Sequence, residues 1–174
     1  MTRMRRCTLA TLALGLAAVL FHSQVAAAVV TRGDDVLRAG DVDGALRLYE
    51  RALRLDPSAA VAADRLAFYL SMRHNRAGAH RAIAVVGTAL VAGANDPALL
   101  ADRAFAELQL HAWRAAEDDF ARAGSATHDA RYHHFAARMA LRAADRAAAR
   151  RYAQLALADD PAFAPARAFM RSLR

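Results

Sequence analysis

Histidines are the first residues of this chain whose type and spacing could support chemistry. The sequence contains seven histidines, and His133-His134 is the densest pair. Neighbouring residues on a helix point about 100° apart, so this pair does not converge on one metal ion. No histidine pair has the i, i+4 spacing with a carboxylate that a helical zinc site uses. The histidine pattern therefore predicts structural roles and no metal site.

The acidic run Glu117-Asp118-Asp119 is the second candidate for chemistry. Consecutive helical positions place at most two of these carboxylates on one side, and no partner base is evident. We therefore expect a solvated helix face. No nucleophile-elbow context surrounds Ser58, Ser71, Ser125 or Ser172. The sequence predicts that the protein is not an enzyme and that it carries no cofactor.

Charge is unevenly distributed along the chain. The formal net charge is +7, and all 24 basic residues are arginine. Residues 96–129 carry a net charge of −4 and residues 131–174 a net charge of +6. The basic end is not interleaved with stacking aromatic residues, which argues against a nucleic-acid partner. Cys7 is the sole cysteine, which excludes an internal disulfide and a cysteine-based metal motif.

The N-terminus has the three parts of a secretory signal peptide. Residues 1–6 are basic, residues 8–21 are apolar, and residues 25–28 offer small side chains for cleavage after Ala28 or one residue earlier. The apolar part is shorter than the roughly 20 residues that a membrane-spanning helix needs. We expect residues 1–28 to be removed, which would place a bacterial protein in the periplasm or outside the cell. The alternative is a retained inner-membrane anchor, with the rest of the chain facing the periplasm.

Helices must position any site in the remaining chain, and the clearest helix lies between Gly40 and Pro57. Its apolar residues recur at a period near 3.6, and Pro57 ends it. The pattern returns three more times, with turns at positions 40, 74, 111 and 144 that are separated by 34, 37 and 33 residues. Matching small, aromatic or proline residues in the copies are Ala45, Tyr49, Ala52, Ala67, Ala104, Ala116, Phe120, Ala137, Ala149 and Pro161.

A helix-turn-helix pattern with a period of about 34 residues resembles the tetratricopeptide repeat. The best copy matches the family consensus at Gly40, Ala45, Tyr49, Ala52 and Pro57. The resemblance implies an all-α fold in which about four helix-turn-helix repeats stack in a short right-handed superhelix. The repeats would cover about residues 29–59, 60–96, 97–129 and 130–161, which together make a repeat domain over residues 29–161.

Small side chains mark the expected contacts within each repeat. Ala67, Ala104 and Ala137 would lie where the two helices come closest, because bulk there would push them apart. The first leading helix would begin near Ala26, so signal cleavage would shorten it. The last repeat would expose an apolar face, and we expect residues 162–174 to cover it as a capping helix.

The third copy departs from the pattern, because strict register would bury the charged side chains of Arg103 and Glu107. Burying unpaired charges is costly. We therefore shift the leading helix of this copy by about one residue. The shifted helix would bury Ala101, Ala104 and Leu108.

Candidate binding residues come from the leading helices, which line a concave ligand-binding surface in the family that the chain resembles. In the fourth copy one helical stripe carries Arg131, His134, Arg138 and Arg142. The planar donor fork of arginine suits carboxylates, so this row could clamp an acidic peptide. The alternative interpretation is a solvated helix face. In the second copy Phe68 and Met72 would add apolar contacts to the same groove.

The sequence thus predicts a non-enzymatic adaptor of the bacterial cell envelope that binds a protein or peptide with acidic segments. The alternative is a structural subunit, either self-associating or membrane-anchored, in a secretion or polysaccharide-export assembly. Self-association would join the acidic middle of one molecule to the basic end of another. The fold does not choose between these functions.

Overall fold

The structure of the chain is a computed structural model that describes the backbone of residues 2–173 and the side chains of residues 20–173. These residues form nine helices and no strand. The helices are α1 (Thr2–Arg38), α2 (Val42–Leu55), α3 (Ala60–Met72), α4 (Arg76–Val91), α5 (Pro97–Gln109), α6 (Trp113–Thr127), α7 (Ala130–Arg142), α8 (Arg146–Asp159) and α9 (Ala164–Ser172).

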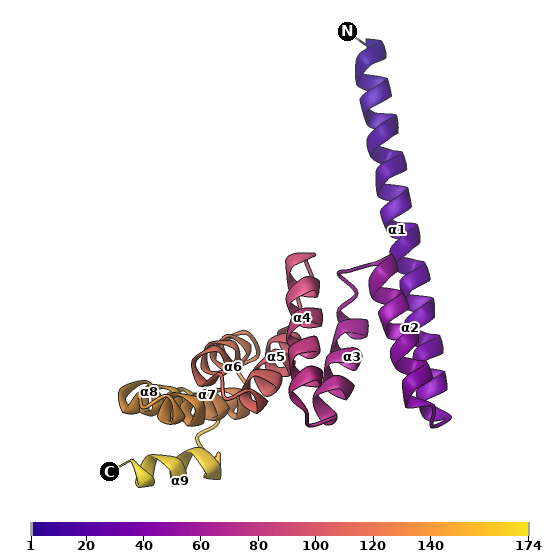
Figure 1. Cartoon of the computed structure of the whole chain (residues 1–174). Helices are drawn as coiled ribbons and strands as arrows, with labels where there is room; N and C mark the ends of the chain where they lie inside the picture. Colours follow the sequence, from indigo (N-terminus) through magenta and orange to yellow (C-terminus); the bar gives the residue numbers. More distant parts are fainter. Residues whose placement is uncertain (1, 174) are drawn as a thin grey trace.

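Each helix packs against the next one in the chain, and the helices stack in pairs (Figure 1). The pairs are α1–α2, α3–α4, α5–α6 and α7–α8, and α9 follows the last of them. The leading helices α3 and α5 also contact each other directly, so successive pairs form one continuous stack. The predicted all-α fold of stacked helix-turn-helix units is therefore confirmed.

The turns inside the pairs share one backbone conformation. Gly40 has φ of 90°, and His74, His111 and Ala144 have φ of 48°, 60° and 63°. These are the four turn positions from which the repeat spacing is measured. A left-handed backbone is free of strain for glycine and disfavoured for other residues. The repeat geometry therefore imposes this conformation on the two histidines and the alanine.

Close approach of the two helices within a pair depends on small residues. Ala67, Ala104 and Ala137 are fully buried, as expected. In the first pair Gly33 takes this role, because a Cβ there would lie 2.6 Å from Cε1 of Tyr49. The Tyr49 ring is fully buried, and its hydroxyl donates a hydrogen bond of 2.6 Å to Asp34. In the first pair, a small residue on the leading helix thus makes room for a large one on the trailing helix.

The expected register of α5 is wrong. Ala101 and Ala104 are buried as predicted, but Leu108 is half-buried and Glu107 is 8% exposed. The helix keeps the strict repeat register because Arg103 has a partner in α6. Its guanidinium donates to both carboxylate oxygens of Asp119, with Nη2 2.7 Å from Oδ1. A buried charge is tolerated when it is paired and hydrogen-bonded, so the shift is unnecessary.

The acidic run of α6 is also different from the expected solvated face. Asp118 is exposed, but Glu117 and Asp119 are buried. Asp119 faces Arg103, and Glu117 lies 3.4 Å from Arg114. Burial and the nearby Asp119 raise the pKa of Glu107 to about 7, although Arg103 opposes the shift. Glu107, Glu117 and Asp119 therefore belong to the interior of the α5–α6 pair.

Helix α1 continues without a break across the predicted cleavage site at Ala28 and projects beyond the end of α2 (Figure 1). Ala26 and Val30 are buried in the core of the first two pairs, whereas Leu20 and Phe21 are exposed. Side chains before residue 20, which include most of the predicted signal peptide, lie outside the described residues. From residue 20 onward, no helix is long and apolar enough to cross a membrane.

The C-terminal helix α9 covers the last pair. Leu173 is 2% exposed and packs with Phe169 against α7 and α8. Arg146 and Arg150 of α8 donate hydrogen bonds of 2.8 and 2.9 Å to the carbonyl oxygen of Leu173. These bonds satisfy a carbonyl at the end of α9 that has no partner within the helix.

Candidate functional site

Side chains at equivalent positions of successive leading helices form one surface. Phe68, Phe105 and Arg138 are equivalent positions of α3, α5 and α7, and so are Met72, Gln109 and Arg142. We call the surface formed by these six residues and their neighbours the leading-helix face. Residues three or four apart on a helix project on the same side, so each helix contributes a stripe.

A hollow of about 400 Å³ lies on this face between α3 and α5. Phe68 and Met72 are about half exposed, and Phe105 is 38% exposed. Large apolar side chains that remain this exposed on a concave surface are typical of a binding site. The lining residues are Phe68, Ser71, Met72, His74, Asp102, Phe105, Leu108 and Gln109.

Three polar atoms in the wall of the hollow have no hydrogen-bond partner. They are Oγ of Ser71, Oδ2 of Asp102 and Oε1 of Gln109, and all three are buried. The amide nitrogen of Gln109 does have a partner, since it donates to the carbonyl oxygen of Ser71 at 3.0 Å. Buried polar atoms are normally paired, and leaving one unpaired costs about 1–3 kcal/mol. The concentration of such atoms in one wall indicates a site that a ligand completes.

The electrostatics of the hollow are set by Asp102. Its burial, followed by the neighbouring carboxyl group of Asp64, raises its pKa to about 8. Asp96 raises this pKa further, and Arg65 lowers it. Burial and the Asp64 carboxyl group thus favour the protonated form of Asp102.

The structure places the predicted peptide-binding residues differently in the two halves of the face. Phe68 and Met72 line the hollow. Arg138 is exposed, and the guanidinium of Arg142 lies 5.0 Å from the centre of the Trp113 ring. Among the described side chains, neither arginine is paired with a carboxylate. Both are free to contact an anion.

The other two predicted binding residues of α7, Arg131 and His134, already contact other side chains of the protein. Arg131 is bound to the carboxylate of Asp129, which caps the same helix. His134 is half-buried, and Phe163 and Phe169 lie edge-on to its ring at 5.7 and 5.6 Å. Burial, together with the charge of Arg138, lowers the pKa of His134. The surface available to an anion on α7 is thus narrower than the sequence pattern predicts.

Sequence reasoning missed Phe105, Asp102 and Gln109. Phe105 and Gln109 follow from Phe68 and Met72 if the 37-residue spacing between α3 and α5 is applied strictly, and Asp102 lies three residues before Phe105 on the same helix. The shift of register that we assumed for α5 moved them off the face. The repeat spacing is the signal in the sequence that places α5 in register with α3.

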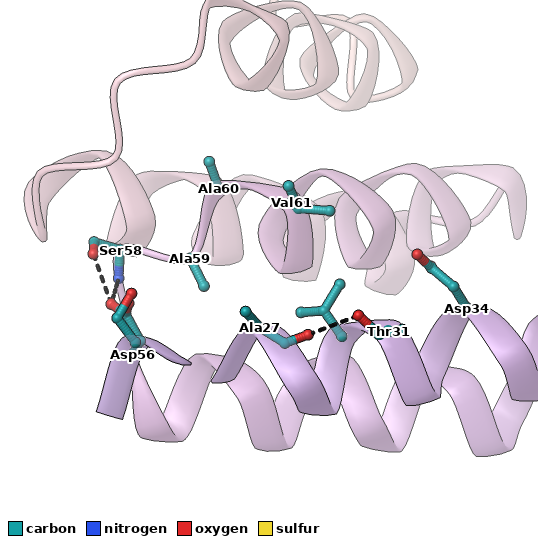
Figure 2. Close-up of a pocket in the computed structure, with 10 residues that line it drawn as sticks. Ala27, Thr31, Asp34, Asp56, Ser58, Ala59, Ala60 and Val61 are labelled. Carbon is teal, nitrogen blue, oxygen red and sulfur yellow. Dashed lines mark hydrogen bonds between the residues drawn. The ribbon is translucent and has the colours of Figure 1, made fainter. Parts of the chain in front are cut away.

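A second hollow, of about 510 Å³, lies between α1 and the connection from α2 to α3 (Figure 2). Its polar groups are already partnered. Thr31 donates to the carbonyl oxygen of Ala27 at 3.1 Å, and the hydroxyl of Ser58 donates to Asp56 at 2.6 Å. Asp34 accepts a hydrogen bond from the Tyr49 hydroxyl. This hollow is larger, but it lacks the unpaired atoms of the hollow on the leading-helix face.

Ser125, His133 and Asp159 lie in the order of a hydrolase triad. His133 Nδ1 is 2.6 Å from Asp159, and its Nε2 is 3.5 Å from the Ser125 hydroxyl. However, Ser125 lies inside α6, where backbone N–H groups are bonded within the helix and cannot stabilise an oxyanion. His133 is also 3% exposed. We interpret the three residues as a structural connection between α6, α7 and α8.

Comparison with known proteins identifies the fold. No protein-family model and no curated protein matches the chain. Among solved structures, the chain is similar to the MamA protein (TM-score 0.70, 18% identity over 87% of this chain and 80% of that one). It is also similar to YrrB, described as a TPR protein with an unusual peptide-binding site (TM-score 0.69, 18% identity over 83% of this chain and 74% of that one). A third similar structure is PilF of Pseudomonas aeruginosa (TM-score 0.67, 19% identity over 87% of this chain and 68% of that one). At these identities the likeness shows the fold alone, which is that of tetratricopeptide-repeat proteins.

Proposed function

We propose that the protein is an adaptor that binds an extended segment of a partner protein on the leading-helix face. The observation that carries this proposal is the hollow between α3 and α5, with its exposed Phe68 and Met72. Peptide binding by YrrB, a protein of the same fold, supports this use of the architecture. An apolar side chain of the segment would displace water from the two exposed side chains, which is the usual source of affinity at such sites.

An acidic stretch of the same segment would bind to α7. Arg138 and Arg142 lie one repeat further along the face than the hollow and are not paired with carboxylates of the described chain. Contact with the Trp113 ring leaves the N–H donors of Arg142 available for a carboxylate. Two arginines suit a short acidic stretch, and Arg131 is held by Asp129.

We place this adaptor in the bacterial envelope, outside the cytoplasm. Support comes from the basic, apolar and small-residue parts of positions 1–28. The retained inner-membrane anchor is the alternative. N-terminal sequencing of the protein recovered from cell envelopes separates the two, since an intact Met1 would contradict cleavage.

The test is selection of random peptides on the immobilised full chain, followed by affinity measurement with two variants. Phe68→Ala with Met72→Ala removes the apolar side chains of the hollow without adding charge and should weaken binding of the selected peptides at least tenfold. Val91→Ala is the matched control, because Val91 is 91% exposed on the trailing helix α4. It should change the affinity less than twofold.

Failure to select any peptide would contradict the proposed function, as would equal effects of the two variants. Sedimentation of the full chain at low salt completes the experiment. A concentration-dependent oligomer would favour the self-associating structural subunit instead.

A further inference from the structure

The hollow between α3 and α5 contains chemistry that an apolar side chain of a ligand would not use. We infer that the hollow receives an arginine side chain of the bound segment, with its guanidinium at Asp102 and its stem against Phe68 and Phe105. This inference rests on the proposed function and names the residue type that the site selects.

The unpaired atoms of the hollow call for hydrogen-bond donors. Oε1 of Gln109 can only accept, the carboxylate of Asp102 accepts when ionised, and the hydroxyl of Ser71 can accept. A guanidinium has five N–H donors and no acceptor, so a single arginine could satisfy all three oxygens. Lysine offers three donors from one point, which matches oxygens spread over two helices less well.

The charges around the hollow also favour a cation. Asp64 of α3 and Asp96 of α5 both act on Asp102, and Asp34 of α1 lies 3.7 Å from Arg65. Arg65 acts on Asp102 as well, and it is bound to Asp64 at 2.9 Å. An added positive charge would therefore restore balance, whereas an acidic ligand residue would be repelled.

The walls suit the stem of an arginine. Phe68, Met72, Phe105 and Leu108 line the hollow and can cover the methylene groups, while an aromatic face can contact the guanidinium. The three oxygens expose almost no surface. Binding therefore requires side chains that line the hollow to turn aside, and Phe68 and Met72 are about half exposed.

Proton release should accompany binding. Burial and Asp64 raise the pKa of Asp102 to about 8, and a bound cation would lower this pKa. Affinity should then rise with pH between 6 and 8, by up to tenfold per unit for one released proton, and level off above 8. The groups that face Asp102 or line the hollow with it are Asp64 and Arg65 of α3, Asp96 at the start of α5, Tyr132 of α7 and His74.

The experiment uses the peptides selected on the full chain. The expected peptides carry arginine beside an apolar residue, and exchange of that arginine for citrulline should weaken binding at least tenfold. Citrulline keeps the stem and removes the charge, and it leaves the protein unchanged. Asp102→Asn should produce a similar loss and abolish the pH dependence. The control Asp118→Asn removes one exposed carboxylate from α6 and should change the affinity less than twofold.

The outcomes separate this inference from the proposed function. Peptides that lack a basic residue, or that bind the Asp102→Asn variant as tightly as the parent, would overturn the inference and leave peptide binding intact. An absence of binding peptides would overturn both. If the Asp102→Asn variant does not fold, the citrulline exchange and the pH profile of the parent protein still decide the matter.

Discussion

The pairs α5–α6 and α7–α8 have the same backbone plan and different interiors. Residues 33 apart are equivalent, so Ala104 and Ala116 of the first pair correspond to Ala137 and Ala149 of the second, and all four are fully buried. Around these shared alanines the two pairs diverge. Phe120, Arg103 and Asp119 correspond to Ala153, Ala136 and Tyr152.

This difference separates what the fold requires from what it permits. The closest contacts between helices require a small residue, because the backbones approach each other there. The neighbouring positions accept either a large ring with an ion pair or an alanine with tyrosine, provided that the volume and the polar groups are matched. The following predictions test how independent these two solutions are.

The largest effect should follow from removing the central ring of α5–α6. Phe120 is fully buried between Phe105 and Phe135, with ring centroids 5.0 and 5.1 Å away. Phe120→Ala should lower the free energy of unfolding by about 3–5 kcal/mol through lost burial and the cavity it leaves. Urea denaturation measures this loss. A loss below about 1 kcal/mol would mean that the pair collapses onto the alanine packing of α7–α8.

Breaking the ion pair of α5–α6 should have a somewhat smaller effect. Arg103→Ala removes the two short hydrogen bonds to the buried carboxylate of Asp119 and leaves it with the weaker ion pair to Arg122 at 3.6 Å. We expect a loss of about 3 kcal/mol. The double variant Arg103→Ala, Asp119→Tyr copies the residues of α7–α8 and should recover most of it. A double variant no more stable than the single one would show that the two interiors cannot be exchanged.

Glu107 should make α5–α6 sensitive to pH, since its counterpart in α7–α8 is Ala140. Its pKa of about 7 in the folded state exceeds the usual 4.5, so the folded state holds a proton that the unfolded state releases between these values. Its contribution to stability therefore falls as the pH rises through this window. Glu107→Gln should stabilise the protein by about 1–2 kcal/mol at pH 8 and have little effect at pH 4. Unfolding curves at both pH values measure this. The prediction is refuted if the stability difference between Glu107→Gln and the parent protein is the same at pH 4 and pH 8.

The smallest effect concerns the turns. Ala144 has a positive φ in the turn of α7–α8, as His111 has in that of α5–α6. Ala144→Gly should raise the stability by about 0.5–1 kcal/mol, because glycine adopts this backbone without strain. Ala143→Gly is the matched control, since Ala143 has φ of −79° and gains no relief. Thermal melting of the two variants in parallel distinguishes them.

Most of the fold could be predicted from the sequence because its determinants are local and repeated. The small residues and the turns at positions 40, 74, 111 and 144 specify helix pairs at a fixed spacing. The pairing of Arg103 with Asp119 could not be predicted, since periodicity tells which side of a helix a residue occupies and not which residue it meets. That missing partner caused the error in the register of α5.

The candidate site was predictable in part for the same reason. Phe68 and Met72 follow from the register of α3 alone. Asp102 and Gln109 require the register of α5, and the raised pKa of Asp102 depends on Asp64, which lies 38 residues away in the sequence. The position of His134 depends on Phe163 and Phe169 near and within α9, which only the tertiary structure brings together.

If residues 1–28 are the leader that we propose, the unbroken course of α1 makes the removal of that leader depend on folding. Ala26 is fully buried and Val30 nearly so, and both lie within two residues or so of the predicted cleavage point after Ala28. Once the first pair has folded, that peptide bond lies within a helix packed on α2, and a peptidase would reach it only after local unfolding. Folding of the first pair and removal of the leader would then compete for the same residues. The stability of that pair would set how long the leader remains attached.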